Sequence, residues 1–78
     1  MSRPARPNPP LARTIRLNLI RMRSARGLTQ TDLARASRIS QGTVALIESG
    51  KRAPGLQVID RLAKGLGCAA IDLLREAA

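Results

Sequence analysis

The chain has 78 residues, which suits one small domain that buries only about 60% of the surface its unfolded form exposes. Its 14 Lys and Arg against 5 Asp and Glu give a formal charge of +9, so a polyanionic partner is expected, with improved solubility as the alternative reading. Because there is no His and a single Cys, a zinc site, a His-dependent active site and an internal disulfide are excluded, and we expect no metal and no cofactor.

Residues 1–10 hold four of the five prolines together with Arg3 and Arg6. Proline removes backbone donors and disrupts helix interiors, so this segment is predicted to be a flexible arm preceding a domain over residues 11–78. The two arginines suit insertion into a DNA minor groove, and the alternative is a solubilising tail.

A first helix is predicted from Leu11, because Ile15, Leu19 and Met22 form one apolar stripe at helical spacing. Gly27 stands where a left-handed residue ends such a helix.

A second helix is predicted to begin after Thr29, whose side chain can cap it while Asp32 completes a capping box. The turn Arg38-Ile39 is too short for antiparallel packing, so the next helix follows at a steep angle after its cap, Ser40.

The third helix, within "SQGTVALIESG", directs Val44 and Ile47 inward and ends at Gly50. Its outer side then carries small or apolar groups, which are poor hydrogen-bonding partners. The basic loop "KRAPG" follows.

Two more helices complete the prediction. The fourth begins after Pro54, and its apolar positions at helical spacing are Leu56, Ile59, Leu62, Ala63 and Leu66. The last carries Ile71, Leu73 and Leu74, and Cys68 before it is expected to be a small core residue.

Helix, tight turn and capped helix, followed by a basic loop, is the arrangement that places a helix in the DNA major groove. The run "GLTQTDLARASRISQGTVALIESGKRAPGLQVIDRLAKGLG" resembles the lambda-repressor-like (Cro/C1 or XRE) helix-turn-helix family of regulators. The resemblance extends from Ile15 to about Leu74. It implies a compact all-α domain of five helices in which residues 40–49 form the recognition helix.

The resemblance also implies site residues. It pairs Arg23 with Glu48 as a structural ion pair, with a direct DNA contact as the alternative. From side-chain chemistry, Gln41 suits bidentate reading of adenine, Ala45 and Leu46 suit thymine methyl groups, and Gly42 permits close approach. Implied phosphate contacts, with Thr43 placed on the flank of the helix, are Gln30, Thr43, Ser49, Lys51 and Arg52, although Lys51 and Arg52 also suit an ordinary solvated loop.

Two positions depart from the family pattern. Arg38 stands where Gly is usual, and a left-handed residue there costs on the order of 1 kcal/mol. Ala69 replaces a polar cap of the last helix, which removes about 1 kcal/mol of capping.

The expected function is sequence-specific regulation of transcription. The protein is expected to be a repressor whose partner is double-stranded DNA, and to bind a palindromic operator as a homodimer. Ile71, Leu74 and Ala77 are the candidate dimer stripe, with core packing as the alternative. Two other readings stay open, an antitoxin that also binds a toxin protein and a restriction-modification controller.

An enzyme is not expected, because the five acids are scattered and no phosphate loop is present. No apolar run approaches the roughly 20 residues of a membrane span, so a cytoplasmic location without membrane contact is expected.

Overall fold

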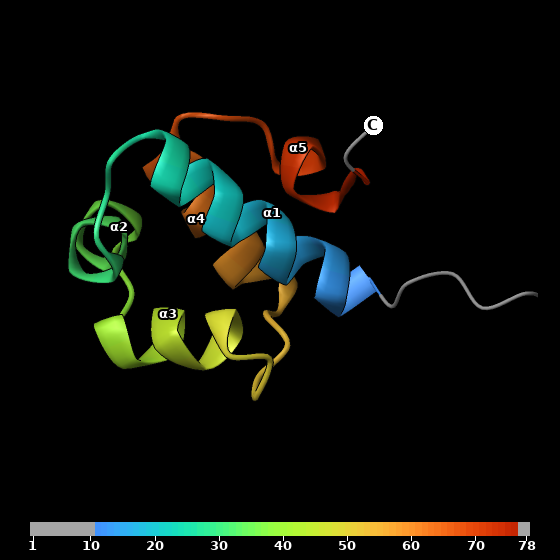
Figure 1. Ribbon diagram of the computed structural model, residues 1–78, viewed down its shortest axis with the longest axis horizontal. Coiled ribbons are helices and arrows are strands. Elements are labelled where there is room, and N and C mark those ends of the chain that lie inside the picture. The colour runs from blue at the N-terminus through green and yellow to red at the C-terminus, as the bar shows by residue number, and fades with distance from the viewer. Residues whose placement is uncertain (1–10, 77–78) are drawn as a thin grey trace, which may run out of the picture.

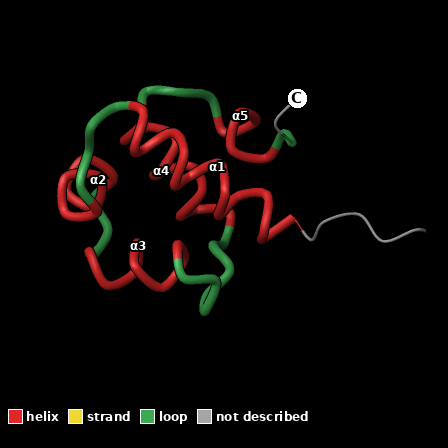
Figure 2. Tube along the Cα trace, viewed as in Figure 1, coloured by secondary structure: helices red, strands yellow, loops and turns green. Residues whose placement is uncertain are grey.

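The computed structural model describes residues 11–76, so Arg3, Arg6 and Ala77 lie outside the described residues. It contains the helices α1 (Leu11–Ala25), α2 (Gln30–Ser37), α3 (Gln41–Glu48), α4 (Leu56–Leu66) and α5 (Ala70–Leu74) (Figure 1). Loops alone connect them, and residues 11–76 form no strand (Figure 2). The expected all-α fold is confirmed.

The helices pack around one aliphatic core. α2 packs against both α3 and α4, α1 packs against α3 and α5, and α4 against α5. In Figure 1, α5 and α3 lie on opposite sides of α1. The buried hydrophobic residues are Ile15, Leu19, Leu33, Ala34, Val44, Ile47, Ile59, Leu62, Ala63, Leu66 and Leu73.

Local sequence signals set the helix ends. Thr29 Oγ1 accepts a 3.0 Å hydrogen bond from the Asp32 backbone N–H, and Asp32 Oδ2 accepts one of 2.9 Å from the Thr29 backbone N–H. The hydrogen bond from the Thr29 backbone N–H, followed by that of its side chain, lowers the pKa of the Asp32 carboxyl. Ser40 Oγ accepts from the Thr43 backbone N–H at 3.0 Å. Both expected N-caps are therefore present.

The turn between α2 and α3 contains a strained residue. Arg38 has φ 57° and is the one described non-glycine residue with a positive φ. Its carbonyl accepts a 3.1 Å hydrogen bond from Arg61 Nη1 of α4. This long-range bond holds the turn in the left-handed conformation that Gly usually provides.

The first residue of α4 shares the helical spacing of the apolar stripe but not its burial. Leu56 is 85% exposed, whereas Ile59 and Leu62, later in the same stripe, are buried. The stripe extends one turn beyond the core, because none of the helices within residues 11–76 covers the start of α4. Cys68 is half-buried against the core, and burial raises the pKa of its thiol.

A buried amide fastens α5 to α1. Asn18, 2% exposed, donates from Nδ2 to the carbonyls of Leu73 at 2.8 Å and Arg75 at 2.7 Å. At the other end of α5, the Ala69 backbone N–H donates to Asp72 Oδ2 at 3.1 Å. The short helix is thus held at both ends despite lacking a side-chain cap at Ala69.

α2 and α4 cross at very close range. A Cβ added to Gly65 would lie 2.1 Å from Ser37 Oγ and 3.1 Å from Ser37 Cβ. Only a residue without a side chain fits there.

No helix of the described chain is both long and apolar enough to cross a membrane.

Candidate nucleic-acid interface

α3 is held on the domain by one side and presents the other to solvent. Val44 and Ile47 are buried at 0% and 1% exposure. On the outer side Gln41 and Gly42 are exposed, Ala45 is half-buried, and Leu46 is 38% exposed. The outer side thus begins with an amide and continues with small or apolar groups.

An ion pair anchors the end of α3 to α1. Arg23 Nε and Nη2 donate to Glu48 Oε2 at 2.6 Å and Oε1 at 2.9 Å, and the side chains are 18% and 6% exposed. Arg23 Nη1 also donates to the Leu28 carbonyl at 2.8 Å. Glu48 is therefore turned into the domain, where its negative charge is matched by Arg23 and not directed at an approaching phosphate.

The pKa values of the pair move apart. Burial on its own raises the pKa of Glu48, but hydrogen bonds from Arg23 and Gln30 and the charge of Arg23 outweigh it, so the pKa lies below its usual value. The hydrogen bond to Glu48 raises the pKa of Arg23 above its usual value, against the opposing effect of burial. Both groups therefore remain charged at neutral pH.

Two glutamines continue from this ion pair to the surface. Gln30 Nε2 donates to Glu48 Oε1 at 3.0 Å, and Gln30 Oε1 accepts from Gln41 Nε2 at 2.9 Å. We call the connected side chains of Arg23, Glu48, Gln30 and Gln41 the polar relay. An amide nitrogen carries two protons, so Gln41 keeps one N–H and its Oε1 free for a ligand.

The remaining predicted phosphate contacts lie around α3. Lys51 and Arg52 are exposed in the loop after it, and both backbone N–H groups donate to the Leu46 carbonyl, at 3.0 and 3.2 Å. Ser49 Oγ donates to the same carbonyl at 3.0 Å. Thr43 Oγ1 lies 2.8 Å from Ser40 Oγ at the start of α3. The loop is thus tied to the helix and its basic side chains stay at the surface.

Negative charge near this surface is scarce. Asp60 pairs with Lys64 on α4, and Asp72 of α5 pairs with Arg75 directly after that helix. Asp32 is exposed in the first turn of α2, where it accepts from the Thr29 backbone N–H. Within residues 11–76, no three His, Cys, Asp or Glu side chains form a group able to hold a metal ion. The loop after α3 therefore carries the positive charge of Lys51 and Arg52, and α3 itself contributes no basic side chain.

The sequence interpretation brought together Arg23 and Glu48 but missed the link from them to Gln41. Gln30 was expected only to meet phosphate, whereas its amide also joins the ion pair to the start of α3. No local pattern signals this, because the partners lie 18 and 11 residues from Gln30.

Comparisons with known proteins agree with this geometry. A family model described as helix-turn-helix matches residues 19–73. No curated protein matches the chain.

Three solved structures share the fold. The hypothetical transcription factor NHTF from Neisseria is 27% identical with a TM-score of 0.83, covering 96% of this chain and 88% of its own. The restriction-modification controller protein C.AhdI from Aeromonas hydrophila is 31% identical with a TM-score of 0.76, covering 80% and 94%. The clp gene regulator ClgR from C. glutamicum is 28% identical with a TM-score of 0.77, covering 86% and 87%.

Proposed function

Because the chain belongs to the Cro/C1-type helix-turn-helix family and is a DNA-binding transcription regulator, we propose that it represses transcription by binding a palindromic operator as a homodimer. The proposal assigns α3 to the major groove and the flanking polar and basic groups to the phosphates.

The polar relay is the observation that supports base reading by α3. Gln41 donates one N–H to Gln30, which is itself held by Glu48. The remaining N–H and Oε1 of Gln41 match the N7 acceptor and N6 donor of adenine. An amide that is already oriented loses less side-chain entropy on binding, so its discrimination between bases is stronger.

The rest of the outer side of α3 reads DNA by shape and apolar contact. Ala45 and Leu46 meet thymine methyl groups, and Gly42 adds no side chain between the helix and the bases. A Cβ at Gly42 would meet only Ser40 Oγ, at 3.9 Å, so the glycine is not required by packing within the domain. Its role in the proposal is close approach to DNA, and specificity depends partly on DNA shape.

Phosphate contacts orient the domain without reading sequence. One N–H of Gln30 Nε2 remains after its bond to Glu48 and can donate to a phosphate. The other assigned groups are Thr43, Ser49, Lys51 and Arg52. Lys51→Ala or Arg52→Ala should weaken binding to all sequences. Each should lower the magnitude of the slope of log K against log[salt] by about 1.

The homodimer places two α3 helices in major grooves about one helical turn apart. Of the predicted dimer stripe, Ile71 is 56% exposed, Leu74 is half-buried against the core, and Ala77 lies outside the described residues. Ile71 on α5 is therefore the side chain that supports an interface there. Ile71→Asp should lower self-association in sedimentation equilibrium and leave the helical content unchanged.

The direct test is selection of bound sequences from random duplex DNA at physiological salt. A sequence-specific dimer should enrich a motif with two inverted half-sites. Enrichment of no motif would contradict sequence-specific reading, and a single half-site would contradict the dimer. A reporter gene with the enriched sequence across its promoter then distinguishes a repressor, which lowers expression, from an activator.

The role of Gln41 is tested on the selected duplex. Gln41→Ala should cost about 1–3 kcal/mol at one base pair and leave the preference elsewhere unchanged. Gln57→Ala, an exposed glutamine on α4, is the matched control and should bind as the wild type does. Equal losses for both variants would show that Gln41 does not read a base.

Leu46 separates DNA reading from the antitoxin alternative. If Leu46 contacts a thymine methyl, Leu46→Ala relaxes one base preference in the selection. If it belongs to a toxin-binding surface, the variant keeps its base preference and loses a co-purifying small protein.

A second candidate, control of restriction-modification genes, is favoured by the 31% identity to the controller C.AhdI. The DNA chemistry is the same and only the target differs. This candidate requires the selected sequence to lie upstream of a gene pair for a nuclease and a methyltransferase.

A further inference from the structure

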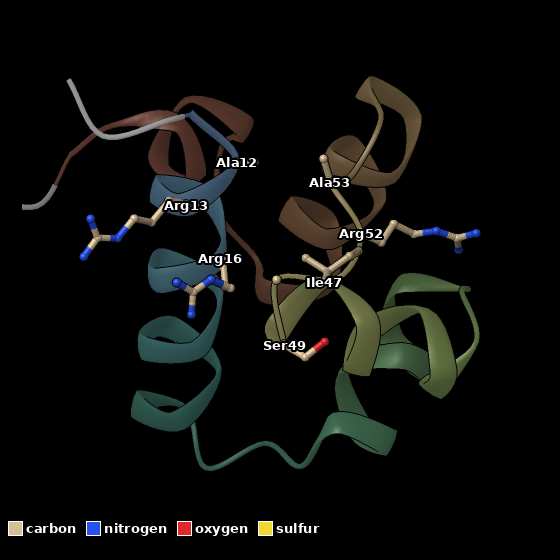
Figure 3. A pocket seen from close by; sticks show the side chains of 8 residues that line it. Ala12, Arg13, Arg16, Ile47, Ser49, Arg52 and Ala53 are labelled. Carbon is tan, nitrogen blue, oxygen red and sulfur yellow. The ribbon is translucent and has the colours of Figure 1, made fainter. Parts of the chain in front are cut away.

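A basic cleft lies outside the helix-turn-helix, between the start of α1 and the end of α3. Its volume is about 340 Å³, and Figure 3 shows the side chains that line it. The α1 wall carries Arg13 and Arg16, and the opposite wall carries Ser49 and Arg52. No acidic residue lines the cleft.

The three arginines do not form a single cage. In Figure 3, Arg13 and Arg52 extend away from the cleft in opposite directions, and Arg16 lies between them. A Cβ added to Gly50 would lie 3.5 Å from Arg16 Nε and 3.6 Å from its Cδ, so the side chain of Arg16 rests against the end of α3. This arrangement suits an extended polyanion passing along the row better than one small ion.

Arg16 is half-buried, and it has no polar partner within residues 11–76. Among the Lys and Arg of residues 11–76, only Arg16 and Arg23 are half-buried. Arg23 has Glu48 and the Leu28 carbonyl, whereas within this part of the chain Arg16 makes no hydrogen bond and no ion pair. A partly desolvated cation without a counter-charge is costly, and an anion bound in the cleft removes that cost.

The position of the cleft indicates the anion. Ser49 and Arg52 line it and also belong to the proposed phosphate-contacting set beside α3. The α1 wall includes the first turn of a 15-residue helix that has no acidic residue there, so its dipole also favours an anion. We propose that the cleft seats a DNA backbone phosphate, with Arg16 as its central ligand and α1 as an additional contact outside the helix-turn-helix.

This inference rests on the proposed DNA binding, and its test separates the two. Binding to a short fluorescein-labelled duplex is measured by anisotropy over a series of KCl concentrations. Arg16→Gln should weaken binding to selected and unrelated sequences alike and reduce the magnitude of the salt slope by about 1. Arg16→Lys keeps the charge, so its salt slope should lie close to that of the wild type.

Arg75→Gln is the matched control, because it removes the same charge from an exposed residue directly after α5 and should leave the slope unchanged. If the wild type binds no duplex, the proposed function fails. If it binds and Arg16→Gln keeps the wild-type slope, only the cleft assignment fails. Circular dichroism verifies that each variant is folded.

Neutral methylphosphonate linkages, placed singly along the selected duplex, locate the contact. One position should weaken the wild type and have no further effect on Arg16→Gln, and the absence of any such position would overturn the proposal. Inorganic phosphate tests a free ion as the source. If inorganic phosphate binds the cleft saturably and no methylphosphonate position depends on Arg16, the cleft is a site for a small anion. That result would also overturn the proposal.

Discussion

Removal of Glu48 tests the polar relay most sharply. Its carboxylate accepts from Arg23 Nε at 2.6 Å, Arg23 Nη2 at 2.9 Å and Gln30 Nε2 at 3.0 Å. Glu48→Ala leaves Arg23, 18% exposed on its side chain, with only the Leu28 carbonyl. Breaking a buried pair costs about 3–5 kcal/mol, and because water still reaches Arg23 we expect a loss of about 2–3 kcal/mol.

That loss is large for this chain. A native chain of this length has a free energy of unfolding of about 4–12 kcal/mol, so the melting temperature should fall by roughly 10–20 °C. Urea unfolding followed by circular dichroism measures it, since the sequence has no Trp or Tyr for fluorescence. Asp60→Ala removes an exposed pair whose side chains are 58% and 76% exposed and should change stability by less than about 0.5 kcal/mol. Equal losses of unfolding free energy for Glu48→Ala and Asp60→Ala would show that the buried pair stabilises the fold no more than the exposed one.

A double variant separates stability from DNA reading. Arg23→Met with Glu48→Leu replaces the pair by apolar groups of similar size and should recover most of the lost stability. Gln30 then has no acceptor at position 48, so the preference at the base pair read by Gln41 should remain weakened. Full wild-type preference in this stable variant would show that the relay does not orient Gln41.

Three further outcomes follow from packing and charge. Asn18→Ala leaves the last carbonyls of α5 without donors and should cost about 2–3 kcal/mol, with faster hydrogen exchange in α5 than elsewhere; uniform loss of protection would contradict a local latch. Gly65→Ala should cost about 1–3 kcal/mol in thermal melts, because its Cβ would lie 2.1 Å from Ser37 Oγ, whereas Gly42→Ala, with open space, should gain up to about 1 kcal/mol. Finally, because the folded pKa of Glu48 lies below 4.5, the unfolded chain binds the proton more tightly. Stability should therefore be level above about pH 5 and fall as pH drops through 4.5 toward the folded pKa, and Glu48→Gln should flatten that fall.

The sequence predicted the helix ends well because they depend on neighbours. Thr29 and Ser40 bond to groups three residues away, and Gly27 and Gly50 take φ values of 67° and 80° that other residues avoid. The left-handed Arg38 was also expected from its place in the turn.

Features that depend on distant partners escaped prediction. Leu56 follows the apolar spacing of α4, but burial requires a second surface, and no described residue covers Leu56. Asn18 reads as an ordinary polar interruption, and its carbonyl partners lie 55 and 57 residues away. The same holds for the site, where the types of Gln30 and Gln41 suggested DNA contacts while their mutual hydrogen bond required the fold.

The hydrogen bonds of Asn18 also affect when α1 can pack stably during synthesis of the chain. α1 leaves the ribosome early, yet its buried amide has no acceptors until the carbonyls of residues 73–75 emerge. Until then water satisfies the amide, and the surface of α1 that α5 covers in the folded domain stays exposed. We therefore expect α1 to stay only loosely attached on the nascent chain until α5 has emerged, so that the domain becomes able to bind DNA only after that step.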